Sequence, residues 1–471
     1  AAANTTTLSS AITLMADSRI AVVSGATLSL NTTSTISGDY GLTYGIASTT
    51  AYVGGTTATN YNGTITVGGN NSYKGLTNIA FGKVSLGATG SGANSPLGTV
   101  DGGTVVNTGA VLDLNGKNLA TAELLTISGT GISNSGALMN SSATTATYSG
   151  LHTLGATSSV IAGSGTIALT NPGIITGAGF ELKLGGIASA SSSISSIIGL
   201  GNGAVTKQDS GTWTLTGANT YTGITTVAGG ILSVTLLDIG GNASSLGASS
   251  ANASNLVFSG GSFQYSGSTA ASTDRLFTVT ASGATALTIS TSSTGSLSFT
   301  NSGSIVNSAL LANRLTLSAN TTNTITFNPV WGNPTTGVAA LYTAGSGTVV
   351  LGGLNTYTGI TSAGSGTLSV SVLADGGAPS NIGQSSNAAA NLIIAGTFKY
   401  TGATATTDRL FTISGNIILN AGSGALIFSN TNSLVNSYGA AAAITLSGTG
   451  TATLNPVLPN NGSNVLSLTK S

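Results

Sequence analysis

The chain has 471 residues with 11 basic and 11 acidic side chains, so its formal net charge is zero and only 5% of its residues are charged, against about 25% in ordinary soluble proteins. This balance excludes recognition of nucleic acid or of an anionic membrane through a long-range field. Cysteine is absent, which excludes disulfides and thiolate metal sites, and no apolar run approaches the 18 or so residues that a membrane-spanning helix needs.

Residues 1–70 form an N-terminal segment in which NTTTLSSAITLMADSRIAVVSG is strand-like. We expect this segment to cap the fold or to be donated as a strand to a neighbouring subunit. The chain begins AAANTTT, with neither a basic region nor an apolar region of a signal peptide. We interpret this start as a mature N-terminus from which the signal peptide has been removed.

Beyond residue 70 the chain has the pattern of short strands. Runs rich in Thr, Val, Ile and Leu alternate with Gly, Asn and Ser, as in GTWTLTG at Gly211–Gly217 and NTITFNP at Asn323–Pro329. Glycine every few residues disfavours long helices. The sequence therefore predicts an all-β protein.

Three copies of one phrase organise this region: NSYKGLTN from Asn71, NTYTGITT from Asn219 and NTYTGITS from Asn355. The second and third copies extend into a long repeat with small deletions, and the first copy is more diverged. We therefore predict a diverged first repeat over 71–207, a second over 208–343, and a third with the C-terminal strand over 344–471. We assign a structural role to the motif positions Asn71, Tyr73, Gly75, Asn219, Tyr221, Gly223, Asn355, Tyr357 and Gly359.

The stretch at residues 211–234, GTWTLTGANTYTGITTVAGGILSV, resembles the passenger-associated transport repeat, also called the autotransporter-associated β-strand repeat. The resemblance implies a secreted bacterial surface protein whose repeats form rungs of a right-handed parallel β-helix, a β-solenoid, and assist passenger folding and export. Typical autotransporters end in a membrane barrel, whereas this chain ends NVLSLTKS without a barrel-sized tail. We therefore expect a surface protein without the membrane barrel and do not carry self-transport over to it.

A β-solenoid explains the scarcity of charge. Its strands stack about 4.8 Å apart, so a charge repeated on successive rungs would repel itself, whereas Thr, Ser and Asn can hydrogen-bond along the stack. In this interpretation NTYTGITT is a corner and the strand that follows it. Asn219 and Gly223 supply the turn, Tyr221 lies on a neighbouring rung, and Ile224 points inward.

Candidate catalytic residues are few and scattered. His152 is the only histidine, Glu123 and Glu181 are isolated, and the nine aspartates form no calcium-loop pattern. We expect His152 to be a surface or ladder residue, and we predict no catalytic, cofactor-binding or metal-binding residue. The chain is thus expected not to be an enzyme, although a polysaccharide-active site built across rungs stays an alternative.

Two charged pairs are kept in both long repeats: Asp274-Arg275 and Asp408-Arg409. One interpretation makes them a subunit contact or a ligand site. The other makes each pair the cap of a short turn, in which Asp accepts backbone N–H groups and Arg covers an apolar edge.

The sequence favours a structural function: an extracellular bacterial surface protein that self-assembles into a filament or surface layer through strand and end-to-end contacts. The alternative is an autotransporter-type adhesin passenger that displays a β-helical rod, with Ser304–Gly337 as the best candidate for a displayed loop. Trp331 in that loop is either exposed or, as we prefer, packed on the next rung.

The expected partners follow from these two functions. They are further copies of the chain in a homo-polymer and a glycan or host-surface ligand, without nucleic acid and without a membrane span in this chain. The expected location is outside the cell or on the outer surface of a bacterium.

Overall fold

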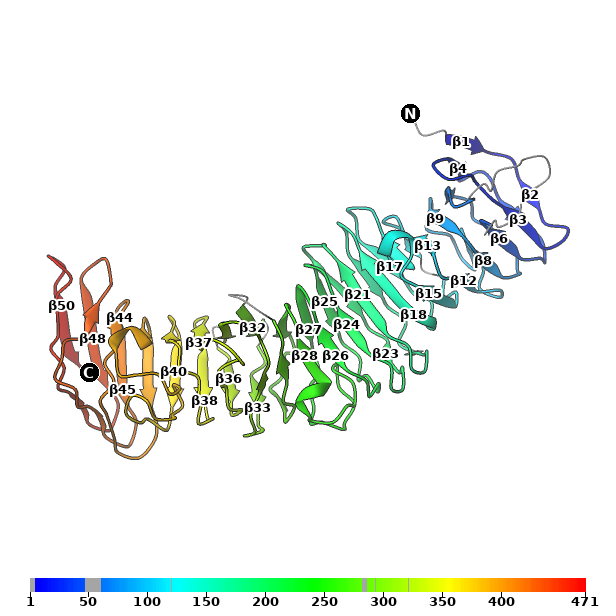
Figure 1. Cartoon of the computed structure of the whole chain (residues 1–471). Coiled ribbons are helices and arrows are strands. Elements are labelled where there is room, and N and C mark those ends of the chain that lie inside the picture. Colours follow the sequence, from blue (N-terminus) through cyan, green and yellow to red (C-terminus); the bar gives the residue numbers. More distant parts are fainter. Residues whose placement is uncertain (1–4, 47–60, 120, 282–285, 293, 321) are drawn as a thin grey trace. The chain divides into compact units, whose positions relative to one another are not determined.

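A computed structural model describes residues 5–46, 61–119, 121–281, 286–292, 294–320 and 322–471. Nearly every regular element in these ranges is a strand, and the strands stack in parallel ladders (Figure 1). The helices in these ranges are single 3-10 turns: η1 (Ile132–Asn134), η2 (Ala253–Asn255) and η3 (Ala389–Asn391). The predicted all-β parallel β-solenoid is confirmed, and its right-handedness stays a prediction.

The chain divides into two compact units. Unit 1 contains Ala1–Leu232 and Asn242–Ser249, and unit 2 contains Ser233–Gly241 and Ser250–Ser471. The strand β27 (Ile231–Val234) contains the boundary at Leu232. The four segments drawn from the sequence repeats stay predictions, and part of the first, residues 1–4 and 47–60, lies outside the described residues.

Unit 1 is built from three long parallel ladders. The first contains β1 (Thr5–Leu8), β4 (Thr27–Leu30), β7 (Thr64–Val67), β9 (Gly82–Leu86), β13 (Ala110–Asp113), β16 (Leu138–Asn140), β18 (His152–Ala162), β21 (Leu182–Gly186), β24 (Val205–Lys207) and β26 (Thr225–Val227). The second contains β3 (Ser18–Ile20), β6 (Leu42–Tyr44), β8 (Thr77–Ile79), β12 (Thr104–Val106) and β15 (Leu125–Gly129), and it joins the first at β18. The third contains β14 (Asn118–Leu119), β17 (Ala146–Tyr148), β19 (Ile167–Leu169), β22 (Ser191–Ile194) and β25 (Thr212–Leu215).

Short strand pairs complete unit 1 at its corners. The parallel pairs are β2 (Ile12–Thr13) with β5 (Ile36–Ser37) and β20 (Ile174–Ile175) with β23 (Ile197–Ile198). The antiparallel pair is β10 (Asn94–Ser95) with β11 (Gly98–Thr99).

Unit 2 repeats this construction. One ladder contains β29 (Ser262–Tyr265), β32 (Ala286–Thr291), β35 (Asn313–Ser318), β37 (Ala339–Ala344), β39 (Thr361–Ala363), β41 (Leu392–Ile394), β44 (Thr412–Ile413) and β47 (Val435–Asn436). A second contains β30 (Ala271–Thr273), β33 (Leu297–Phe299), β36 (Thr324–Phe327), β38 (Thr348–Leu351), β40 (Thr367–Val370), β42 (Thr397–Tyr400), β45 (Ile417–Ala421), β48 (Ala442–Ser447) and β50 (Leu466–Lys470). Two short ladders contain β28 (Leu256–Phe258), β31 (Thr278–Val279) and β34 (Val306–Asn307), and β43 (Ala405–Thr407), β46 (Leu426–Phe428) and β49 (Ala452–Leu454).

The alternating sequence of the strands produces this core. In β36 the residues Ile325 and Phe327 are fully buried while Thr324 and Thr326, which alternate with them, are half-buried, as expected for a strand with one inward face. Register keeps like residues over one another, because Phe299 pairs with Phe327 on the next turn. Their ring centroids lie 5.7 Å apart in an edge-on arrangement, which adds to the stability given by burial.

Outward polar side chains bond along the stack, as the composition predicts. The amide of Asn107 donates to the side-chain oxygen of Asn78 at 3.0 Å, and the hydroxyls of Ser191 and Thr214 lie 2.6 Å apart. These bonds need small uncharged side chains at one position on successive turns, which is why so few charges are tolerated.

The length of one turn varies along the solenoid. Leu341 pairs with Thr361, 20 residues later, whereas Thr361 pairs with Leu392, 31 residues later. The longer turn contains an excursion over residues 374–385, which we call the 374–385 loop. No helix in the described ranges is long and apolar enough to cross a membrane.

Candidate functional site: the repeated corner and its buried polar groups

The repeated phrase forms a corner held by the side chain of its asparagine. The Asn355 side-chain oxygen accepts the backbone N–H of Trp331 from the preceding turn at 2.8 Å, and its amide donates to the Asn381 carbonyl of the following turn at 2.6 Å. Its own N–H donates to the Ser380 carbonyl at 2.9 Å. The same three bonds occur at Asn219, with Ile198, Ser245 and Ser244, and at Asn71, with Ile36, Pro96 and Ser95. The asparagine thus joins three successive turns, and it is fully buried in every copy.

The tyrosine of the phrase fills the inside of the same corner. The Tyr357 and Thr361 hydroxyls lie 2.6 Å apart, and Thr361 donates to the Ile382 carbonyl at 2.9 Å, so Tyr357 is the donor of the first bond. Gly383 lies against the ring with φ +80°, and a Cβ there would lie 2.6 Å from the tyrosine ring. Equivalent groups are Tyr221, Thr225 and Gly247, and Tyr73, Thr77 and Gly98.

The glycine of the phrase allows a close approach between turns. A Cβ at Gly359 would lie 2.3 Å from the Ala339 carbonyl oxygen, and one at Gly223 would lie 2.2 Å from the Gly203 carbonyl oxygen. At both positions glycine is needed because backbone of the previous turn occupies the space of a side chain. The predicted structural role of the motif positions rests on these contacts.

One part of the predicted corner is wrong. Ile224 does not point inward, because 44% of it is exposed, while Thr225 beside it is buried. The reason is the tyrosine: Tyr221 already fills the interior of the corner, so the inward face of β26 begins at Thr225, one residue later than expected.

The side chains of Asp408 and Arg409 hydrogen-bond to the 374–385 loop. Arg409 is 2% exposed and donates to the carbonyls of Ala374 and Gly383, each at 3.0 Å, and to the Ser385 hydroxyl at 3.0 Å. Two longer bonds reach the carbonyls of Asp375 and Ala378. Since Gly383 also contacts the Tyr357 ring, this guanidinium fixes the corner as well as the loop.

The aspartates of both pairs accept backbone N–H groups, as in the turn-cap interpretation. Asp408 accepts the N–H of Gly376 at 2.7 Å, and Asp274 accepts that of Gly240 at 2.6 Å. The arginines do not cover an apolar edge. Arg275 is 2% exposed and donates to the Ser250 carbonyl, so each pair ties down a loop of its own chain. Their role as a subunit contact or ligand site stays a prediction.

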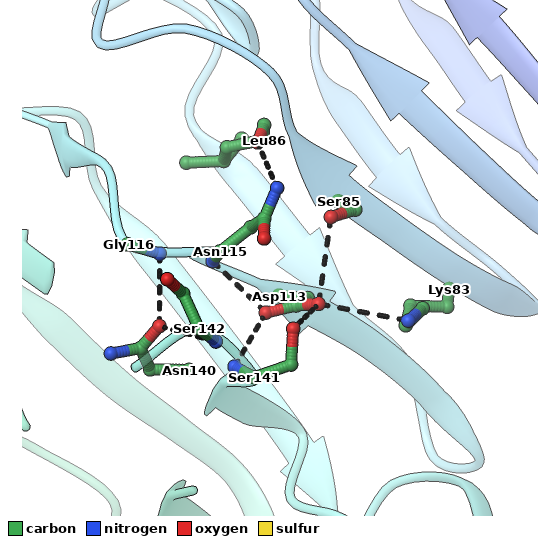
Figure 2. Close-up of polar contacts among 9 residues, drawn as sticks. All are labelled: Lys83, Ser85, Leu86, Asp113, Asn115, Gly116, Asn140, Ser141 and Ser142. Carbon is green, nitrogen blue, oxygen red and sulfur yellow. Dashed lines mark hydrogen bonds and ion pairs between the residues drawn. The ribbon is translucent and has the colours of Figure 1, made fainter. Parts of the chain in front are cut away.

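Asp113 forms a third buried polar network, in unit 1 (Figure 2). Its carboxylate accepts the backbone N–H of Asn115 at 2.9 Å and both the N–H and the hydroxyl of Ser141, at 3.0 and 2.7 Å. Lys83 lies 3.6 Å away and Ser85 donates at 3.5 Å. Its lone pairs are therefore engaged by the chain itself, which indicates a structural role. Among the described residues no three His, Cys, Asp or Glu side chains gather as a metal site would require.

Glu123 is fully buried beside the first corner, which its isolation in the sequence did not indicate. Ser95 donates to its carboxyl group at 3.2 Å, and Thr104 also donates to it. Burial raises the pKa of Glu123 to about 7, against the lowering effect of these two hydroxyls.

His152 lies in a ladder, as one expectation had it, but its side chain is not at the surface. It is 1% exposed on β18, and its ring meets the Tyr148 ring edge-on at 5.1 Å between centroids. Burial lowers the pKa of His152 to about 4, and a backbone hydrogen bond at Gly150 acts in the opposite direction. The low charge of the chain gives His152 no carboxylate partner in the described part of unit 1 that would favour the cation.

The two buried groups give opposite pH dependences. The pKa of Glu123 in the folded chain lies above its ordinary 4.5. Its contribution to the free energy of unfolding is therefore full below pH 4.5 and is lost as pH rises through 7. The pKa of His152 in the folded chain lies below its ordinary 6.5. Its contribution to the free energy of unfolding is therefore present above pH 6.5 and is lost as pH falls through 4. We expect Glu123→Gln to make stability rise relative to wild type between pH 4.5 and 7, and His152→Phe to make it fall relative to wild type between pH 4 and 6.5, each by on the order of 3 kcal/mol.

Urea unfolding at half-unit pH steps measures these slopes, with each variant compared with wild type at the same pH. The other carboxylates titrate alike in both proteins and cancel in the difference. A difference between variant and wild type that stays constant across pH 4–8 would contradict the burial of the group concerned.

The Ser304–Gly337 segment contains Trp331, for which the sequence allowed either an exposed side chain or one packed on the next rung. Trp331 is fully buried, and its indole N–H donates to the Ala340 carbonyl at 3.3 Å, so the packed interpretation is confirmed. The exposed large apolar side chains in the described part of this segment are instead Val306, Leu310 and Leu311, at 48%, 66% and 58%.

Comparison with known proteins supports the repeat. The family model of the passenger-associated-transport-repeat matches residues 205–234 and 341–370, which cover the second and third corners. The adhesin BmaC autotransporter of Brucella suis biovar 1 (strain 1330) is 34% identical over 376 residues, or 78% of this chain. The chain spans 10% of the length of that relative. No solved structure matches the chain. The predicted resemblance to surface proteins that carry these repeats is confirmed.

Proposed function

We propose that this chain is a segment of the passenger of an autotransporter-type adhesin, carried outside the cell or on the outer surface of a bacterium. The observation that carries the proposal is the extent of the match to the Brucella adhesin. It spans 376 residues, far more than the 60 residues that the repeat model covers, so the likeness includes the turns between the repeated corners.

The corners suit a solenoid that must stay folded without disulfides in an oxidising exterior. Each one replaces a covalent crosslink by a buried asparagine and a tyrosine-threonine pair that join successive turns. Loops such as 374–385 and the exposed part of Ser304–Gly337 then extend from a regular support. In this proposal the chain has no enzymatic activity and needs no cofactor, and its partner is a component of a host surface.

The self-assembling filament or surface-layer subunit, which the sequence favoured, has no support in the comparisons. It rested on the low charge, the regular strand repeat and the uncovered strands at the two ends of the chain. Because the chain matches only 10% of a longer relative, those ends carry no argument about assembly. The adhesin passenger, first held as the alternative, is therefore the proposal, and polymerisation stays an unsupported prediction.

Surface display tests the proposal. The chain, fused to the export signal and translocation domain of an unrelated autotransporter, is displayed on a non-adherent Gram-negative strain and the bacteria bound to cultured epithelial cells are counted. We expect severalfold more bound bacteria than with the fusion partners alone at equal surface density. Equal binding by the two strains, with the chain shown to be folded by resistance to protease, would contradict the proposal.

A further inference from the structure

An apolar groove of about 640 Å³ lies on the outward face of unit 2, across β35, β37 and the turn that precedes β39. Its walls include Leu311, Val338 and Ile360, and its floor includes Ala340. Leu311 is 58% and Val338 47% exposed, although each belongs to a rung whose inward side is well packed. The volume falls within the range of small-ligand sites, roughly 300–1,000 Å³.

A single cation stands at this groove. The Arg314 guanidinium lies over the Tyr342 ring, 4.7 Å from its centroid, and this contact holds an exposed arginine in one place. No carboxylate of the described residues forms an ion pair with Arg314, although carboxylates pair with three lysines elsewhere. The groove therefore presents apolar walls together with one positive charge that the chain does not neutralise.

Besides the Arg314 guanidinium and the Tyr342 hydroxyl, the groove is lined by one further polar side chain, Asn313, which is already engaged. Asn313 is buried, and its amide group exchanges two hydrogen bonds with that of Asn307, at 2.8 and 3.1 Å. The backbone groups of β35 and β37 are paired in the ladder. A sugar, with a hydroxyl on most of its carbons, would lose more hydrogen bonds to water here than Arg314 and Tyr342 could replace. An alkyl chain loses none.

The shape of the groove is set by backbone. Gly337 has φ +92°, and a Cβ there would lie 2.7 Å from the Ala312 nitrogen, so this edge can approach Ala312 only without a side chain. The Thr336 hydroxyl donates to the Leu310 carbonyl and joins the same two segments. The groove is thus formed before any ligand arrives, which lowers the entropic cost of binding.

The third repeat has the same frame without these features. Counted from the paired landmarks Ile305 and Leu434, the positions of Leu310, Leu311 and Arg314 hold Gly439, Ala440 and Ala443. Both repeats place these residues just before or within equivalent strands, β35 and β48, each paired with the next rung. The solenoid therefore needs neither the leucines nor the arginine at these positions, and their presence in the second repeat but not in the third calls for another explanation.

We propose that this groove binds an aliphatic carboxylate, with the unbranched alkyl chain along Leu311, Val338 and Ile360 and the carboxylate on Arg314. The three strands beneath it are about 4.8 Å apart, so the outer two are separated by about 10 Å, which suits a chain of medium length. The inference does not depend on the adhesin proposal, because it concerns a ligand site of the folded chain whatever its partner on a host surface.

Calorimetric titration of the whole chain with decanoate, below its micellar concentration, tests this site. We expect saturable binding of one decanoate per chain. Arg314→Met should weaken it by roughly tenfold or more, since a charge-assisted hydrogen bond is lost while the apolar walls remain. Val338→Asp should abolish it by placing a carboxylate in the wall. Lys399→Met, which removes an exposed cation from another part of unit 2, should leave it unchanged.

Decyltrimethylammonium has the same chain length and the opposite charge, and we expect it not to bind at the groove. Absence of saturable decanoate binding to the wild-type chain would overturn the proposal. So would equal binding of the two amphiphiles, because the arginine would then have no part in recognition. Saturable binding of an acidic oligosaccharide such as sialyllactose that Arg314→Met removes would replace the acyl ligand by a glycan and would overturn the assignment too.

Discussion

Replacing Arg409 by methionine is expected to lower the free energy of unfolding of unit 2 by about 3–5 kcal/mol. Methionine fills much of the same space but offers no donor. The carbonyls of Ala374 and Gly383 and the hydroxyl of Ser385 would each lose a bond of 3.0 Å in a site where the arginine is only 2% exposed. Buried acceptors without a partner cost about 1–3 kcal/mol each, and partial entry of water limits the total.

Urea unfolding followed by tryptophan fluorescence measures this loss. The chain has two tryptophans, Trp213 in unit 1 and Trp331 in unit 2, so a Trp213→Phe background makes Trp331 the reporter of unit 2. Lys399→Met in the same background removes an equal charge from an exposed position of β42 and should change stability by less than about 0.5 kcal/mol. If the two variants were equally stable, the hydrogen bonds of Arg409 to the 374–385 loop would not stabilise unit 2.

The second large effect is expected from Asn355→Ala, at about 4 kcal/mol. The substitution leaves the N–H of Trp331 and the carbonyl of Asn381 without partners inside the fold, where Asn355 itself is fully buried. It also separates three turns that this one side chain joins. The loss should therefore exceed that of an ordinary surface asparagine several times over.

Asn416→Ala is the matched control. Asn416 is exposed and accepts one hydrogen bond, from the N–H of Ala443 at 3.0 Å. We expect a loss of at most about 1 kcal/mol there, measured by the same Trp331 fluorescence. A loss at Asn355 no larger than that at Asn416 would mean that the asparagine of the repeated phrase is not what joins the turns.

The class of the fold was accessible from the sequence because it depends on local and repeated features. Alternating runs such as Ile325 and Phe327 predict strands with one buried face, and the scarcity of charge predicts stacking of like positions. The structural role of the motif followed from its recurrence alone. The spacing of Tyr357 and Thr361, four residues apart in every copy, was also visible and would have indicated their hydrogen bond.

What the sequence did not disclose depends on residues one turn apart. Glu123 appeared isolated, yet its partners Ser95 and Thr104 lie 28 and 19 residues before it in the chain. In the turn-cap interpretation Arg409 was expected to cover an apolar edge. Its burial depends on a loop whose carbonyls converge from positions 26 to 35 residues away. Ile224 was misplaced by a single residue, because strand alternation does not say where a corner ends.

The central claim, that this chain is an adhesive passenger segment, is tested most directly by competition between the purified chain and bacteria that display it. Displaying bacteria are counted on cultured epithelial cells while soluble chain is added in increasing concentration, with sedimentation of the same samples as a check on assembly. The account predicts that a soluble, unassembled chain reduces attachment to the level of the same bacterial strain without the displayed chain. Attachment that is unaffected at saturating chain, or a chain that sediments as ordered polymer and does not compete, would contradict it.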